Sequence, residues 1–156
     1  METRRFDEEF ARDVYTRIRN LPDDVVPRWG RMRKADLLEH FLAALGNSLG
    51  EATFDIPLQS AAWVRTFLKW LILTVEFPML RNVQFKDREG KALPLARSKG
   101  SLMDLKAMLE RVARAGAADV PAPPPHPWFG RLTFEEWKLL HVRHIRHHLK
   151  QFGAPL

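Results

Sequence analysis

The stretch HVRHIRHHLKQF, residues 141–152, decides how the chain is interpreted, because four of its twelve residues are histidine. It continues a helix pattern that starts at Thr133, where Glu136 three residues later completes a capping box. Gly153 is placed to end this helix. The sequence therefore predicts a final helix from about Thr133 to Phe152. Its histidines have three interpretations: a solvated basic surface, a membrane or nucleic-acid helix, or a metal site.

The spacing of side chains on this helix favours the third interpretation. Residues three, four and seven apart share a helix face. One face carries Trp137, Leu140, His141, His144, His148 and Gln151. Because this face includes a tryptophan and a leucine, we expect it to point at the core. The cations are spread around the rest of the helix and make no continuous stripe: Lys138, Arg143, Arg146 and Lys150. A nucleic-acid helix gathers its cations on one face, and a membrane-surface helix has an apolar face opposite a basic one.

Two inward histidines one turn apart indicate a shared ligand. His144 and His148 bring their Cβ atoms within about 5–6 Å, and a buried polar group without a partner costs about 1–3 kcal/mol. A divalent cation satisfies both imidazoles, although a polar core cluster is the alternative. His40 lies in DLLEHF, where Leu37 and Phe41 mark the same side as inward. A lone histidine there is typical of a satisfied core residue, but facing such a pair it completes a triad.

Four further helical stretches precede the last one, over about residues 6–20, 34–49, 60–77 and 101–115. Ser101 with Asp104 three residues later predicts the start of the fourth. The third is the most apolar, but it carries Arg65, Lys69 and Glu76, so we expect a buried amphipathic helix rather than a membrane span. Residues 78–100 have no sustained period and predict a long irregular loop, which is a candidate lid.

Composition limits the class of protein. The chain has 156 residues, 46% of them hydrophobic and 28% charged, which predicts a single globular domain over residues 1–156. It contains no cysteine, which excludes disulfides, iron–sulfur clusters, thiolate zinc sites and a cysteine nucleophile. The first residues lack the apolar core of a signal peptide, so we predict a cytoplasmic protein. The net charge of +6 does not by itself predict a nucleic-acid partner. The expected architecture is an all-α four-helix bundle with a long loop after the third helix.

Two longer motifs resemble the DinB/YfiT-like superfamily of metal-binding four-helix bundles. WGRMRKADLLEHF, residues 29–41, is similar to the family's second-helix pattern. HPWFGRLTFEEWKLLHVRHIRHHLKQFG, residues 126–153, is similar to the ending of a DinB-like branch of unknown function. The resemblance covers essentially the whole chain, including the Glu76-Phe77-Pro78 turn. It departs at Arg33, where the branch usually has a serine or threonine that caps the second helix.

The resemblance implies a divalent metal, nickel or zinc, held by His40, His144 and His148 near one end of the bundle. It places three residues around the pocket or behind the ligands: His141, Gln151 and His126. His147 lies at the edge of the face and is expected either at the surface or behind the ligands. Asp36, one turn before His40, either supports that histidine or makes an exposed salt bridge.

Three protein ligands leave coordination positions open, which is typical of a catalytic metal. The resemblance implies a metal-dependent enzyme of hydrolase or thiol-dependent S-transferase type that acts on a small molecule, with a low-molecular-weight thiol as a further cofactor. It leaves a homodimer open and identifies neither a substrate nor a catalytic side chain. The alternative is a non-catalytic bundle that acts in stress response or regulation through a protein partner.

Overall fold

The computed structural model describes residues 5–51, 56–75 and 78–156, and these ranges contain helices but no strand. The α-helices in chain order are α1 (Glu8–Asn20), α2 (Lys34–Ser48), α3 (Ala62–Thr74), α4 (Leu102–Arg114) and α5 (Phe134–Gln151). A short 3-10 helix, η1 (Ala117–Asp119), separates α4 from α5. The prediction of an all-α fold is confirmed for the described residues. None of the helices described has the length and apolar character that a membrane crossing requires.

Local capping residues set three of the helix starts. Thr133 accepts a hydrogen bond from the backbone N–H of Glu136 at 3.2 Å, and Ser101 does the same for Asp104 at 3.2 Å. The predicted capping box at Thr133 and the predicted helix start at Ser101 are therefore confirmed. The first helix begins at Glu8, two residues later than predicted, because the Asp7 carboxylate caps it by accepting from the N–H of Phe10 at 2.8 Å.

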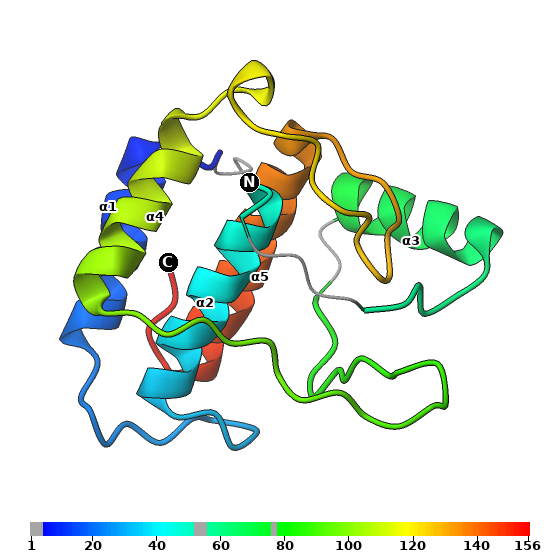
Figure 1. Cartoon of the computed structure of the whole chain (residues 1–156). Coiled ribbons are helices and arrows are strands. Elements are labelled where there is room, and N and C mark those ends of the chain that lie inside the picture. The colour runs from blue at the N-terminus through cyan, green and yellow to red at the C-terminus, as the bar shows by residue number, and fades with distance from the viewer. Residues whose placement is uncertain (1–4, 52–55, 76–77) are drawn as a thin grey trace.

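Helices α1, α2, α4 and α5 share one hydrophobic core. Figure 1 shows α1 beside α4, and α2 beside α5. The most deeply buried apolar side chains of this core include Phe10, Val14, Ile18, Leu37, Phe41, Leu45, Leu105, Leu109, Val112, Val142, Ile145 and Leu149. They recur at intervals of three and four residues along each helix, so each helix has one apolar face. This packing places the histidine face of α5 against α2.

Helix α3 stands to one side of this core, where it packs on α5 (Figure 1). The expectation of a buried helix is wrong: only Ile72 is buried, whereas Trp63 is 76% exposed, and Phe67 and Trp70 are each 54% exposed. Apolar residues occupy more than one side of α3, so contact through Ile72 leaves its aromatic side in solvent. The last two residues of the predicted helix, 76–77, and so most of the Glu76-Phe77-Pro78 turn, lie outside the described residues.

The segment from residue 78 to residue 100 is irregular, as predicted, with one isolated bridge between Lys86 and Ala92. Its last part returns to the four-helix core and runs along α2. There the backbone N–H of Ser98 donates to the carbonyl of Glu39 at 3.0 Å. The predicted lid is therefore attached at this end to the helix that carries His40.

Candidate metal centre

Three histidines from two neighbouring helices meet at one point. His40 comes from α2, and His144 and His148 come from successive turns of α5. The Nε2 atom of His144 lies 2.9 Å from Nε2 of His40 and 3.0 Å from Nε2 of His148. Within the described chain these residues form a group whose ligand atoms lie close enough to hold one ion. The structure therefore brings together the three histidines that the sequence singled out.

The spacing of the nitrogens suits a shared cation. Nitrogens that each lie about 2.0–2.1 Å from one tetrahedral zinc ion stand about 3.3–3.4 Å apart, and the three ligand atoms here lie within 4.8 Å of one another. Hydrogen bonding among the rings is a poorer explanation. In a neutral ring, His144 Nε2 carries at most one proton and so donates to only one of the two neighbouring nitrogens. The lone pair of the other nitrogen is then left without a donor. A metal ion accepts all three lone pairs together.

The proton of His148 is placed by Gln151. The Trp29 carbonyl only accepts, so the Gln151 side-chain nitrogen faces it at 2.8 Å and the amide oxygen faces His148 Nδ1 at 2.8 Å. That oxygen also only accepts, so Nδ1 of His148 carries the proton. The lone pair of Nε2 is then directed at the cluster. Gln151 is 5% exposed and orients the histidine in this way, as the sequence led us to expect.

The proton of His40 is placed by the backbone. Nδ1 of His40 faces the Ala96 carbonyl oxygen at 3.4 Å, which is a long hydrogen bond. Because a carbonyl only accepts, this contact also leaves Nε2 free to bind a metal. His40 and His148 thus have the same arrangement: an oxygen behind Nδ1 and the cluster in front of Nε2.

The triad imidazoles are kept neutral by their surroundings. Burial lowers the pKa of His40 to about 4 and that of His148 to about 3. Burial, with the neighbouring imidazoles as a further cause, also holds the pKa of His144 well below 6.5. Neutral imidazole is the form that binds a metal, so the three nitrogens are available at neutral pH.

His141 and His126 are not part of the triad. His141 is 2% exposed, its Nε2 has no hydrogen-bond partner among the described residues, and its ring packs on that of Trp137 at 5.6 Å. His126 stacks on Phe129 at 4.5 Å, and its Nδ1 accepts from the backbone N–H of Trp128 at 3.1 Å. Both are therefore set in aromatic surroundings beside the N-terminal half of α5. Burial lowers the pKa of each to about 3.

His147 is placed at the edge of the cluster. Its ring meets the Trp29 ring edge-on at 5.5 Å. The guanidinium of Arg81 lies over the same Trp29 ring, 4.2 Å from its centre. Partial burial and the positive charges of Arg81 and Lys150 lower its pKa. His147 also meets the His148 ring edge-on at 5.2 Å, but it is not part of the group of close ligand atoms, which suits it as a control position.

Asp36 forms ion pairs, but not the exposed salt bridge considered from the sequence. It is only 6% exposed, so its ion pairs are not surface salt bridges, and it makes no direct contact with His40 that the structure records. Its carboxylate pairs with Arg33 at 3.1 Å and with Arg97 at 3.0 Å. It also accepts from the backbone N–H of Arg33 at 2.9 Å. Asp36 thereby supplies one half of a capping box and offsets the missing serine or threonine at position 33.

Sequence reasoning missed the groups that orient the histidines. The Ala96 carbonyl faces His40 directly, and the Trp29 carbonyl fixes the Gln151 amide that faces His148. The position of a main-chain carbonyl cannot be recognised from the side chains in a sequence. Arg97 was also missed, because residues 78–100 show no period that assigns a partner to any of them. The one available signal was Asp36 next to a helix start, since an acidic residue there predicts a capping contact.

Two surface hollows of about 360 and 460 Å³ lie along α4, and none of the three histidines lines either.

Over residues 4–154 the chain matches the family described as "Protein of unknown function (DUF1569)", and it therefore belongs to that family. No curated protein and no solved structure matches it.

Proposed function

For this member of the family, we propose a metal-dependent enzyme with a three-histidine centre formed by His40, His144 and His148. We further propose that the fold is of the DinB/YfiT-like type, with α1, α2, α4 and α5 as its four-helix bundle. The observation that carries the proposal is that the three imidazoles converge with their ligand atoms within 4.8 Å of one another, His144 Nε2 lying 2.9 Å from His40 Nε2 and 3.0 Å from His148 Nε2. The shared core of those four helices supports the fold.

The donor set indicates the kind of chemistry. Three neutral ligands leave the full charge of a divalent ion uncompensated and leave coordination positions open. Such an ion, nickel or zinc, supplies Lewis acidity that acidifies a bound water or thiol and polarises a substrate oxygen. We propose hydrolysis, or S-transfer with a low-molecular-weight thiol, on a small-molecule substrate in the cytoplasm.

The chain's own residues would hold and orient the reacting groups. Gln151 fixes the His148 ring, and the Ala96 carbonyl fixes that of His40. His141 Nε2 and Trp137 Nε1 are buried without partners among the described residues, so we propose that they face the bound substrate or an ordered water. We propose that His126 also lines the substrate site, because its ring lies 5.4 Å from that of Trp137.

The test is metal content in protein purified without a nickel column. We expect about one divalent ion per chain in the wild type and none when His40, His144 and His148 are all changed to alanine. His147→Ala is the matched control, because it removes a histidine from the same helix and leaves the triad intact. Equal metal content in the wild type and the triple variant would contradict the proposal. A panel of esters, amides and thiol acceptors then separates hydrolase from transferase.

One observation favours a second function, that of a non-catalytic bundle in stress response or regulation. The exposed aromatic side of α3, formed by Trp63, Phe67 and Trp70, is available for a protein partner or for a second copy of the chain. This function predicts no turnover with the substrate panel. It also predicts a complex in gel filtration that is lost in Trp63→Gln.

A further inference from the structure

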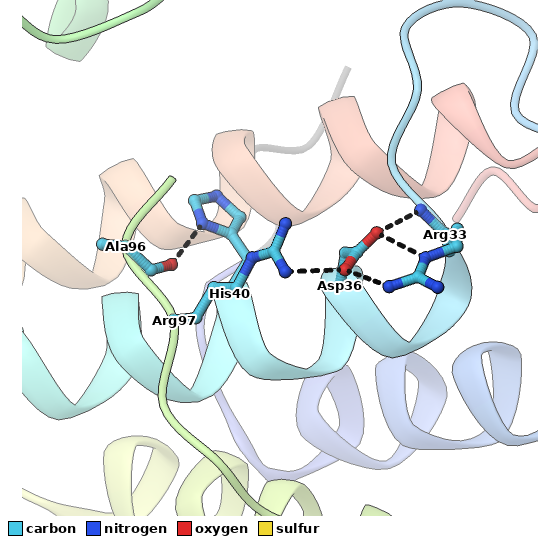
Figure 2. A network of polar contacts seen from close by, with 5 residues as sticks. All are labelled: Arg33, Asp36, His40, Ala96 and Arg97. Carbon is cyan, nitrogen blue, oxygen red and sulfur yellow. Dashed lines mark hydrogen bonds and ion pairs between the residues drawn. The ribbon is translucent and has the colours of Figure 1, made fainter. Parts of the chain in front are cut away.

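Residues 96–98, here called the strap, lie along one turn of α2 and touch it at three successive places. The Ser98 N–H donates to the carbonyl of Glu39 at 3.0 Å, and Arg97 Nη1 pairs with Asp36 Oδ1 at 3.0 Å. Immediately before these anchors in the chain, the Ala96 carbonyl faces His40 Nδ1 at 3.4 Å. Figure 2 shows Ala96 and Arg97 on the strap opposite His40 and Asp36.

The anchor on the helix side is a buried carboxylate shared by two arginines. Asp36 is 6% exposed and pairs with Arg33, next to the helix start, and with Arg97, on the strap (Figure 2). Removing a partner from a buried charge is strongly destabilising, so such a carboxylate holds its partners firmly. The Arg97 side chain is 47% exposed, which leaves it open to substitution.

The contact to His40 is too long to hold the strap by itself. A hydrogen bond at 3.4 Å is weak, whereas the two other contacts are at ordinary lengths. Arg97 adjoins Ala96 in the chain, so fixing its side chain on Asp36 limits how the peptide between them rotates. The orientation of the Ala96 carbonyl is therefore set by the neighbouring contacts.

We propose that the Asp36–Arg97 ion pair positions His40 for metal binding, by holding the Ala96 carbonyl behind Nδ1. This inference rests on the proposed metal centre, but the tautomer of His40 can be measured whether or not a metal binds. Neutral imidazole has two tautomers, and only the Nδ1–H form presents Nε2 to the cluster. Arg97 and Asp36 act through the carbonyl and are positioning residues for a ligand that neither of them contacts.

The experiment compares three variants. Arg97→Gln removes the ion pair to the strap, and Arg97→Lys restores a charge. Arg33→Gln is the matched control, because it removes an arginine from the same carboxylate without touching the strap. The first measurement is the tautomer of His40 in the metal-free protein, read from nitrogen-15 NMR of the imidazole. The second is the affinity for Zn²⁺, measured by competition with a chelator.

We expect the Nδ1–H tautomer in the wild type and in Arg33→Gln, a mixture in Arg97→Gln, and recovery in Arg97→Lys. We expect Zn²⁺ affinity to fall about 10–100-fold in Arg97→Gln and to stay within a few-fold in Arg33→Gln. An unchanged tautomer in Arg97→Gln overturns the inference, as does an equal loss in both glutamine variants. If the wild type binds no metal, the proposed function fails, while the tautomer still decides the role of Arg97.

Discussion

Gln151 connects His148 to the backbone of Trp29, and its two hydrogen bonds can be separated by substitution. We predict that Gln151→Leu lowers metal affinity about 10–100-fold, because His148 loses the acceptor that fixes its tautomer. Unfolding free energy should also fall by about 1–3 kcal/mol, because the Trp29 carbonyl loses its donor. Chelator competition and urea titration measure the two effects.

Gln151→Glu is the control for this pair of effects. A carboxylate still accepts from His148 Nδ1 but has no N–H for the Trp29 carbonyl. We expect it to keep most of the metal affinity and to lose stability. If leucine and glutamate reduce affinity equally, the contact with His148 is not what matters.

Gly30 is required for the same arrangement. Its φ is +77°, and a Cβ atom there would stand 3.0 Å from Gln151 Nε2. We predict that Gly30→Ala costs about 1–3 kcal/mol of backbone strain and also weakens metal binding by displacing Gln151. Gly90 is the matched control, because its φ is +82° but nothing lies within 4 Å of an added Cβ. Equal metal affinity in the two alanine variants would contradict the role of the contact.

The three clustered histidines were predictable at this scale, whereas the groups that orient them were not. Helical spacing put His144 and His148 on one face, and apolar neighbours marked His40 as inward. The orienting carbonyls of Ala96 and Trp29 come from irregular segments whose paths depend on tertiary contacts. No periodicity in the sequence reports where such a backbone oxygen points.

At the scale of elements, α3 shows that an apolar sequence pattern does not determine how a helix packs. Its apolar residues predicted a buried helix, but burial depends on what the rest of the chain offers, and only Ile72 is buried in the small cluster beside α5, with Leu73 packed against that cluster. The starts of α4 and α5 were predictable, because Ser101 and Thr133 cap them through contacts three residues away. Local interactions were thus available in the sequence, and the docking of α3 was not.

The placement of α3 predicts opposite effects for two of its residues. Ile72→Ala should lower the free energy of unfolding by about 2–5 kcal/mol, because it opens a cavity against α5. Trp63→Gln should change it by no more than about 0.5 kcal/mol, because that side chain is 76% exposed. Urea titration of both variants checks the prediction. A large loss for Trp63→Gln would mean that its ring is buried in solution.

At the scale of the whole molecule, buried neutral histidines couple folding to pH. The pKa of His141 is lowered by burial from 6.5 to about 3. Between these values the unfolded chain binds a proton at this position and the folded chain does not. Stability from this residue is therefore complete above about pH 6.5 and is lost as the pH falls toward 3. His40 and His148 act in the same direction.

His141→Asn removes one such proton and leaves the triad in place. In the presence of a chelator, the free energy of unfolding of the wild type should fall steeply from pH 6 to pH 4. The slope in the variant should be smaller by about one proton, or about 1.4 kcal/mol per pH unit. Urea titration at several pH values across this range measures both slopes. Identical slopes would mean that His141 is protonated in the folded chain, which is incompatible with a ring that is 2% exposed in aromatic surroundings.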